Sequence, residues 1–295
     1  MNFLITGGTG FIGTHLVDLL LRNNYNVTVI TDNQYKIKNN QITIISSLSH
    51  LQYKTHFDVI INLAGAPIDK RWTDKYKKIL IDSRINSTNS LVNFVRQGQI
   101  KTELLINASA VGYYGHQKSG QVIDESTKAN SSFTNLLCKK WEKAATEVEK
   151  YGVRVCLMRL GIVLGNGGIV NKLRSPFKFG LGVIFGDGKH IMPWIHIQDV
   201  LGIIYFLIVN QNQCGIFNLT SPDHVNNTQF MTAFAKKMQR NVWVRIPRCI
   251  VKLLYGEMGE ELLLKGNAVQ PRRILKAGYK FLYSDINDAF ADILY

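Results

Sequence analysis

Cysteine is scarce in this 295-residue chain, and its four copies stand far apart. They are Cys138, Cys156, Cys214 and Cys249. Because no two of them form a Cys-x-x-Cys pair, the sequence predicts neither a zinc knuckle nor a disulfide framework. Nothing else in the sequence resembles a metal constellation, so no metal is expected. Reduced thiols are typical of a cytoplasmic protein, which is the location we expect.

Long hydrophobic runs are also missing. Residues 200–209 are uncharged and mostly apolar, but they are too few to cross a bilayer and predict a buried helix. The N-terminus has no basic region, and glycines interrupt it where a signal peptide would be apolar. We therefore expect no secretion signal and no membrane partner.

Acidic residues are few, with 21 Asp and Glu against 35 Lys and Arg, a formal net charge of +14. This excess favours anionic partners. The cations come in pairs such as Lys139-Lys140 and Arg272-Arg273, with no run of five, whereas nucleic-acid binders usually concentrate their charge. Solvated faces are the favoured interpretation, and no nucleic-acid partner is expected.

The apolar residues that are present alternate between strand and helix patterns. Residues 3–5 predict a buried strand, 12–20 a helix by their spacing, and 27–30 a second strand. Further strands are expected at 42–45, 59–61, 104–106 and 153–157, and further helices at 73–97 and 134–150. This alternation predicts an α/β fold, a Rossmann-type doubly wound parallel sheet.

The regular alternation ends near Gly161. Residues 165–188 are rich in glycine and predict loops over a ligand crevice, whereas the chain from 245 on predicts a short helical appendage. Between them we expect helices at 198–210 and 226–240 and a strand at 217–219. The expected division is a Rossmann domain over 1–244, with a smaller substrate-side region inserted after about 161, and a small C-terminal domain over 245–295.

A glycine loop follows the first strand directly. Gly7 permits a tight turn, Gly10 lets a pyrophosphate approach the backbone, and Gly13 allows the helix to pack closely on the strand. The N–H groups at the helix start favour an anion. No Gly-Lys-Ser/Thr follows, so a P-loop nucleotide hydrolase is disfavoured. The predicted cofactor contacts of this loop are Gly7, Thr9, Gly10, Phe11, Ile12 and Gly13.

Ligands of this fold bind outside the carboxyl ends of the strands, which defines the rest of the predicted site. These ends hold Thr31-Asp32, Leu63-Ala64-Gly65, Ser109 and Leu160-Gly161. Asp32 stands 19 residues after Gly13, where a carboxylate accepts hydrogen bonds from the adenosine ribose and favours NAD(H). Lys36 and Lys38 follow and would instead neutralise the 2′-phosphate of NADP(H). Both cofactors stay open, as does a simple turn role for Asp32.

Several dispersed motifs resemble the extended short-chain dehydrogenase/reductases. They are GGTGFIG at 7–13, NLAG at 62–65, SAVGYYG at 109–115 and WIHIQD at 194–199. More narrowly, the chain resembles the bacterial epimerase-family proteins, through KRW at 70–72, SR at 83–84, LCKKWE from 137, RLGIVLG from 159 and a GE…P…GYKF tail. The resemblance covers essentially the whole chain. It implies bound NADP(H) with Arg84, Leu63 and Ala64 among its contacts, a small C-terminal domain, and a homodimer as one expected assembly.

The chain departs from the superfamily in its acid–base residues. A typical member uses Ser, Tyr and Lys, with Tyr and Lys at i and i+4 on one helix. Here the aligned positions hold Leu137 and Trp141, part of an apolar stripe. Ser109 is expected to orient a substrate oxygen, and Tyr113 or Tyr114 to transfer the proton. Tyr114 and Lys118 spell the same motif, but in a loop, where i and i+4 need not share a face.

Two functional hypotheses remain open on the sequence. The first is an NAD(P)-dependent oxidoreductase or epimerase acting on a small substrate with a hydroxyl or carbonyl group, for instance a sugar nucleotide. The second is a non-catalytic protein that binds or senses NAD(P)H. His196 and Asp199 predict structural roles, with Asp199 as the N-cap of the helix that follows.

Overall fold

The computed structural model describes residues 1–31, 42–118 and 120–294. Its centre is a seven-stranded parallel sheet with the strand order β12-β7-β5-β4-β1-β2-β3. The strands are β1 (Asn2–Thr6), β2 (Asn26–Ile30), β3 (Ile42–Ile45), β4 (Thr55–Asn62), β5 (Ile100–Ala110), β7 (Arg154–Leu160) and β12 (Gly215–Leu219). The predicted α/β Rossmann-type fold is confirmed, and the order reverses direction between β1 and β4, where such folds bind ligands.

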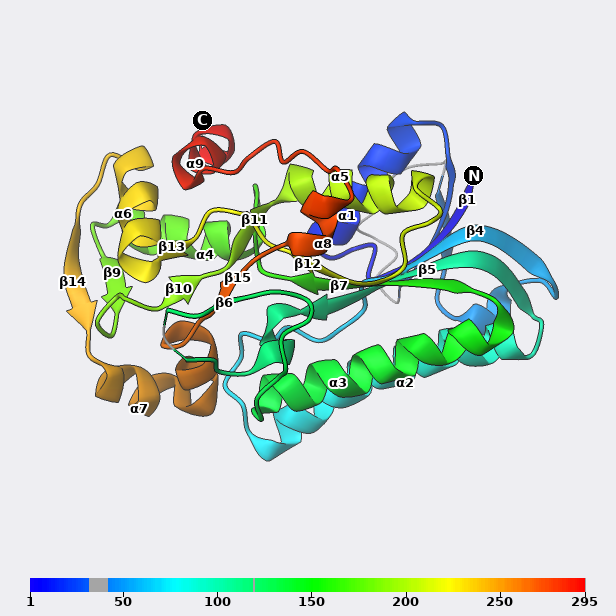
Figure 1. Cartoon of the computed structure of the whole chain (residues 1–295), viewed down its shortest axis with the longest axis horizontal. Helices are drawn as coiled ribbons and strands as arrows, with labels where there is room; N and C mark the ends of the chain where they lie inside the picture. Colours follow the sequence, from blue (N-terminus) through cyan, green and yellow to red (C-terminus); the bar gives the residue numbers. More distant parts are fainter. Residues whose placement is uncertain (32–41, 119, 295) are drawn as a thin grey trace.

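Helices cover both faces of this sheet, which is why its strands are nearly continuous in apolar residues (Figure 1). On one face lie α1 (Phe11–Arg22) and α5 (Ile197–Val209), and on the other α2 (Asp74–Arg96) and α3 (Phe133–Thr146). A short helix at 147–151 extends α3 and ends at Gly152, whose φ of +79° makes the predicted C-terminal cap. The helices expected at 73–97 and 134–150 are therefore present.

A second core lies beyond the carboxyl ends of the central strands, where β7 and β12 lead into it (Figure 1). It gathers Phe177, Phe230, Phe234 and Phe290, whose rings meet edge to face at centroid distances of 4.8–5.2 Å. The helices that build it are α4 (Gly168–Lys178), α6 (Asn227–Lys237) and α9 (Ile286–Leu294). Short strand pairs surround it, formed by β8 (Ile162–Leu164), β9 (Gly182–Phe185), β10 (Ile191–Met192), β11 (Trp194–His196), β13 (Val225–Asn226) and β14 (Val242–Ile246).

The expectation of loops over 165–188 is wrong in part, because this stretch contains α4 and β9. Val170 and Phe177 are seven residues apart and both are buried, a helical repeat that the flanking glycines obscured. Pro176 lies in the last turn of α4, so the hydrogen bond that its missing N–H removes is lost close to the end of the helix. The glycines themselves occupy the ends of the helix.

The C-terminal stretch is mostly helical, with α7 (Arg248–Met258), a π-helical turn at 259–263, α8 (Arg272–Lys276) and α9. It is tied to the rest of the molecule at several points. β14 pairs with β9, a short β15 (Ala268–Val269) pairs with β6 (Val122–Ile123), and α9 packs on α6. The expected boundary after residue 244 falls inside β14, and the division into two domains stays a prediction. Within the described ranges, no helix is both long and apolar enough to span a membrane.

Candidate functional site

The glycine loop between β1 and α1 leaves a hollow, which we call the cradle. Side chains in place of its glycines would fill this hollow. Gly7 has a φ of +69°, and a Cβ atom there would lie 2.7 Å from the carbonyl oxygen of Leu63. A Cβ atom at Gly13 would lie 2.3 Å from the carbonyl oxygen of Gly7. Gly10 is the N-cap of α1 and makes no side-chain cap, so the first N–H groups of the helix face the loop. This backbone fits a pyrophosphate.

Phe11, a predicted contact of this loop, packs against a second glycine loop. A Cβ atom at Gly167 would lie 2.6 Å from its ring, and one at Gly165 or Gly168 would lie 3.0 Å away. Gly167 and Gly168 both have positive φ, so the loop before α4 closes flat on the start of α1. The aromatic ring thus fastens the substrate-side region to the glycine loop.

A cavity of about 250 Å³ lies beside the glycine loop at the ends of β1, β2, β3 and β4. Its lining residues are Thr6, Gly7, Ile30, Thr31, Ser46, Ser47, Leu48, Ala64, Ser87, Ser90 and Leu91. Gly7, Thr31 and Ala64 were predicted, and Thr9 lies near them, with its Oγ1 3.4 Å from that of Thr31. Sequence reasoning missed the four serines. Ser46 follows the strand at 42–45 directly, so the strand-end rule would have found it.

Asp32, Lys36 and Lys38, on which the choice between NAD(H) and NADP(H) depends, lie outside the described residues. The remaining contact implied by the resemblance, Arg84, lies in α2 with its side chain turned to the end of β4. Its Nη2 donates to the carbonyl oxygen of Ala66 at 3.1 Å, and a Cβ atom at Gly65 would lie 2.8 Å from its Cζ. Burial lowers the pKa of this guanidinium, which stays charged at neutral pH. Arg84 therefore brings a cation beside Leu63, Ala64 and Gly65.

A chain of buried polar side chains supports the ends of β1 and β4. Thr6 donates to Asn62 at 2.5 Å, and Asn62 donates to Thr88 at 2.8 Å and to Asn107 at 2.6 Å. Trp141 donates from Nε1 to Thr88 at 3.1 Å. The ring of Trp141, which the sequence resemblance aligns with the superfamily lysine, faces Arg84 at 5.2 Å. Indole packing and a hydrogen bond therefore replace the ammonium group there.

The second position at which the chain departs from the superfamily pattern, Leu137, also lies in apolar surroundings. Leu137 is buried against Trp72, Leu80 and Met258, the last of which belongs to α7. A proton-transferring hydroxyl at this place is replaced by packing between α3 and the C-terminal stretch. The helix start carries a related contact, since Glu261 accepts hydrogen bonds from the N–H groups of Phe133 and Thr134 at 3.0 and 3.1 Å.

A buried charged cluster lies between the ends of β5 and β7. Ser109 donates from its hydroxyl to Glu142 Oε1 at 2.6 Å. Arg159 binds the same carboxylate with two hydrogen bonds of 2.8 Å, from Nε to Oε1 and from Nη2 to Oε2. Ser109 and Arg159 are register partners, and all three side chains are almost inaccessible to solvent. The carboxylate raises the pKa of Arg159 despite its burial, so the guanidinium stays charged.

The geometry of this cluster sets what Ser109 can do. Because Ser109 donates its hydroxyl proton to Glu142, its Oγ lone pairs remain to accept a hydrogen bond. Sequence reasoning missed Glu142 and Arg159, although both stand in the quoted motifs, LCKKWE and RLGIVLG. The available signal was a charged residue at a strand end, Arg159, together with a residue of opposite charge next to Trp141, namely Glu142.

The two candidate tyrosines differ sharply. Tyr114 is fully buried and donates to Asn218 Oδ1 at 2.7 Å, and burial raises its pKa to about 12. Its hydroxyl proton is held by Asn218, so Tyr113 is the better placed of the two for the predicted proton transfer. Tyr113 is half-buried, and its ring centroid lies 3.3 Å from Cζ of Arg159. Lys118 is exposed and follows the short helix of residues 111–114, so Tyr114 and Lys118 share no helix face.

His196 and Asp199 have structural roles, with one correction. The N-cap of α5 is His196, which accepts from the N–H of Gln198, and not Asp199 as expected. Asp199 is buried and accepts from the N–H groups of Leu282 and Tyr283 at 2.7 and 3.0 Å. The Asp199 carboxylate, in the first turn of α5, therefore binds the backbone of the C-terminal stretch. No pattern of neighbouring residues in the sequence predicts this contact.

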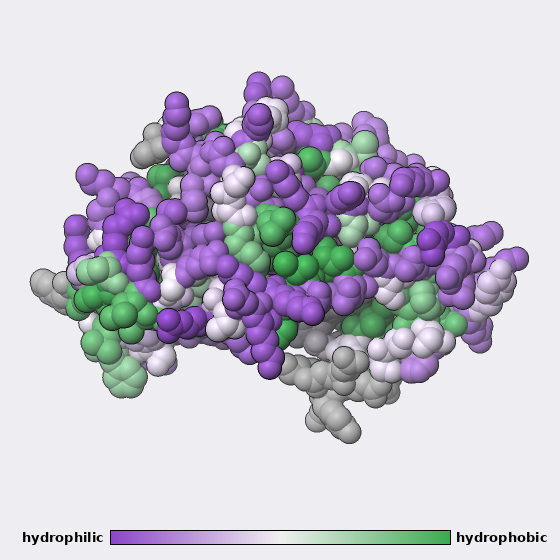
Figure 2. All heavy atoms as spheres, turned by 90° about the horizontal axis from the view of Figure 1, so that it is seen from below, coloured by the Kyte–Doolittle hydropathy of each residue, from purple (hydrophilic) through white to green (hydrophobic). Residues whose placement is uncertain are grey.

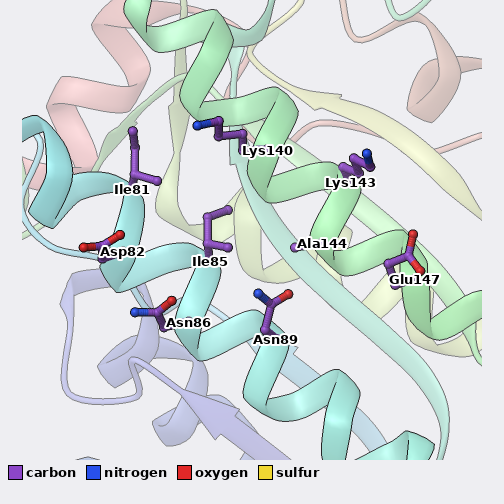
Figure 3. Close-up of a pocket in the computed structure, with 9 residues that line it drawn as sticks. All are labelled: Ile81, Asp82, Ile85, Asn86, Asn89, Lys140, Lys143, Ala144 and Glu147. Carbon is purple, nitrogen blue, oxygen red and sulfur yellow. The ribbon is translucent and has the colours of Figure 1, made fainter.

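A second cavity lies away from these residues. A groove of about 390 Å³ runs between α2 and α3 on the outer face of the molecule, lined by residues of both helices (Figure 3). The labelled lining residues are Ile81, Asp82, Ile85, Asn86, Asn89, Lys140, Lys143, Ala144 and Glu147. It has neither a glycine loop nor a strand end, so we do not assign it to the cofactor. Among the residues that the structure describes, no cluster of three His, Cys, Asp or Glu side chains is placed to hold a metal ion.

Comparison with known proteins agrees with this geometry. The model of the NAD dependent epimerase/dehydratase family matches residues 3–242, and that of a domain of unknown function, DUF1731, matches residues 246–293. The chain therefore belongs to the NAD-dependent epimerase/dehydratase family, and the predicted membership is confirmed.

Individual relatives narrow the group. The chain is 33% identical to the epimerase family protein YfhF of Bacillus subtilis, covering 100% of this chain and 98% of that protein. It is 34% identical to the epimerase family protein SH2119 of Staphylococcus haemolyticus, with 99% of both chains covered. The crystal structure of the human epimerase family protein SDR39U1 with NADPH superposes with a TM-score of 0.89 and 28% identity, covering 100% and 99% of the two chains. The chain is thus an epimerase-family protein of the NAD(P)-binding class.

Proposed function

We propose that the chain binds NADP(H) or NAD(H) and acts as an oxidoreductase or epimerase on a small substrate with a hydroxyl or carbonyl group. The cradle of Gly7, Gly10 and Gly13 would hold the pyrophosphate, and the cavity lined by Thr31, Ser46 and Ser87 would hold the adenosine. The NADPH complex of the human relative supports this assignment. A sugar nucleotide as substrate rests on the family alone.

The observation that carries the catalytic part is the buried cluster of Ser109, Glu142 and Arg159. When bound, the nicotinamide supplies hydride transfer. Ser109 accepts a hydrogen bond from the substrate hydroxyl, because its own proton is held by Glu142. Arg159 holds Glu142 in place, and Tyr113 beside it is the hydroxyl proposed for proton transfer.

A non-catalytic role as an NAD(P)H-binding or sensing protein is the second candidate. It is favoured by Leu137 and Trp141, which replace the acid–base pair with packed apolar side chains. In that case the cofactor would change the capture of a partner macromolecule, and no substrate would be turned over.

The first experiment is thermal unfolding of the chain with NADPH and, separately, with NADH. Binding to the folded state raises the melting temperature by mass action. A larger rise with NADPH would assign the lysines after Asp32 to the 2′-phosphate, and a larger rise with NADH would assign Asp32 to the ribose. If the melting temperature rises with neither cofactor, the proposed function is contradicted and only the fold assignment remains.

The second experiment screens hydroxyl and carbonyl compounds for change in NAD(P)H absorbance, then compares two matched variants. Tyr113→Phe should abolish turnover and leave the cofactor-induced rise intact. Tyr114→Phe should keep turnover, at a stability cost of about 1–3 kcal/mol because Asn218 loses its donor. The reverse result would move the proton transfer to Tyr114, and turnover by both variants would remove it from either tyrosine.

We also propose a homodimer through the groove between α2 and α3. Ile81 and Ile85 lie in this groove among charged side chains of both helices (Figure 3). Ile85→Glu should turn a dimer into a monomer in light scattering, with the cofactor-induced rise unchanged. A wild-type chain that is monomeric in the same measurement would contradict the dimer.

A further inference from the structure

The first helix of the C-terminal stretch, α7, turns its apolar face outward. Leu253 is 75% exposed, Leu254 53% and Ile250 44%, whereas Val251 on the opposite side is fully buried. Most amphipathic helices of globular proteins place leucine toward the core and charge toward water. Figure 2 shows the resulting hydrophobic patch at the left of the molecule, in the place of α7.

The patch continues onto the neighbouring strand and is accompanied by cations. Val244 of β14, which leads into α7, is 42% exposed. Arg245, Arg248 and Lys252 are exposed around the same face. We name the surface formed by Val244, Ile250, Leu253 and Leu254 the α7 ridge.

The nearby carboxylates, among them Asp187 close to Arg248, offset this positive charge only in part. Glu257 at the end of α7 pairs with Lys77 of α2. Glu260 lies 3.1 Å from the Nζ of Lys252 and 3.0 Å from that of Lys265, so one carboxylate faces two ammonium groups. Cations therefore outnumber anions around the α7 ridge, as they do in the whole chain.

We propose that the α7 ridge binds the surface of an anionic lipid bilayer, with α7 lying in the membrane plane. An exposed apolar face bordered by Lys and Arg is the pattern of interfacial helices. The ridge rests on the eight residues of α7 that precede the kink at Gly256, about 12 Å of helix, so it offers a protein partner little of the roughly 800 Å² per side that stable interfaces bury. Lipid headgroups accept an apolar ridge without a matching groove, and their charge complements the arginines.

This inference departs from the expectation of no membrane partner, which considered only segments that could cross a bilayer. A helix that lies on the surface needs no such length. The inference is independent of the proposed function, because the ridge includes no residue of the glycine loop or of the Ser109 cluster.

The experiment is co-sedimentation of the full chain with vesicles of phosphatidylcholine and with vesicles that also contain phosphatidylglycerol. We expect binding to the anionic vesicles only, weakened by salt. The variant Leu253→Ser/Leu254→Ser should bind at least about tenfold more weakly, because two apolar side chains no longer leave water. Arg248→Gln should lower the affinity about fivefold.

The matched control is Leu282→Ser. Leu282 is 69% exposed, but it belongs to the segment between α8 and α9, on the far side of the molecule from α7 in Figure 1. This variant should bind the vesicles as the wild type does, and unchanged thermal unfolding would show that all three variants fold.

Three results would overturn the proposal. They are absence of wild-type binding to anionic vesicles, equal binding by the double leucine variant, and equal loss in Leu282→Ser. If the double leucine variant instead turns a self-associated wild type into a monomer while no vesicles are bound, the ridge is a contact between copies of this chain.

Discussion

The glycine loop and the Ser109 cluster occupy the same edge of one sheet, yet they are built in opposite ways. The loop contributes backbone N–H groups and the absence of side chains, as the close approach of Gly13 to Gly7 shows. The cluster contributes two buried charges, Glu142 and Arg159, joined by two hydrogen bonds, with the Nη1 of Arg159 left without a partner among the described residues. A backbone cradle tolerates variation of its neighbours, whereas a buried ion pair depends on both members at once.

The difference between the glycine loop and the Ser109 cluster explains how the proposed cofactor site is compatible with loss of the usual acid–base pair. The cradle needs only β1, the glycines and α1, which are local in sequence. The positions that hold tyrosine and lysine in typical superfamily members now pack against distant segments. Met258 lies against Leu137, and Thr88 accepts a hydrogen bond from Trp141. The two halves of the site can therefore change separately.

Glu142→Gln is expected to have the largest effect. It leaves the buried Arg159 without its counter-charge, which costs about 3–5 kcal/mol of unfolding free energy. Urea denaturation measures the loss. Glu147→Gln, which removes a carboxylate of an exposed pair a little further along, should leave the urea midpoint essentially unchanged. Equal effects of the two changes would mean that the cluster is not a charged pair in solution.

Gly13→Ala tests the cradle. Its Cβ atom would meet the backbone oxygen of Gly7, which cannot rotate away, so the cost should lie near the upper end of the roughly 1–3 kcal/mol of overpacking. The rise of melting temperature with NADPH should disappear. Thr14→Ala, the next residue on α1, is the control and should keep it. If Gly13→Ala keeps the NADPH-induced rise of melting temperature, the loop adjusts and the cradle is less rigid than the Ser109 cluster.

The pH dependence of stability tests how the substrate-side region is held. His196 is buried beside the ring of Tyr283 with its Nε2 3.3 Å from Asp292, and burial lowers its pKa to about 4. The folded state therefore favours the neutral ring, and the stabilisation is complete above the unfolded pKa of about 6.5 and is lost as the pH falls toward 4.

At pH 5 this loss should amount to about 2 kcal/mol. Urea midpoints at pH 7 and pH 5 measure it, and His196→Asn should remove most of the difference. The control His56→Asn alters an exposed ring next to Asp58 and should keep it. A wild-type chain equally stable at both pH values would show that His196 protonates freely.

Glu261→Gln should have the smallest effect, about 1 kcal/mol, because it weakens the cap that the C-terminal stretch places on α3. Thermal unfolding measures it. Glu257→Gln, which alters a more exposed contact between the same stretch and α2, serves as the control and should change less. If the two variants are alike, α3 does not depend on this cap.

Most of the parallel sheet was predictable because its signals are local. Residues 3–5, 27–30 and 42–45 are apolar runs that end at glycine or polar residues, and each became a strand. The stretch 165–188 failed because α4 is short and begins with glycines, so its buried Val170 and Phe177 gave a weak repeat. The site followed the same division. The place of Ser109 at a strand end was visible in the sequence, whereas the contact of the Tyr114 hydroxyl with Asn218, 104 residues further along, was not.

The sequence by itself determined the βαβ start, the glycine loop and the absence of the usual tyrosine and lysine, because each depends on residues close together along the chain. Only the tertiary structure decided that Glu142 meets Arg159, that Asp199 holds Leu282 and Tyr283, and that the leucines of α7 face outward. These outcomes depend on which surfaces meet after folding. Spacing along a helix defines a face, but it does not say whether that face meets protein or water.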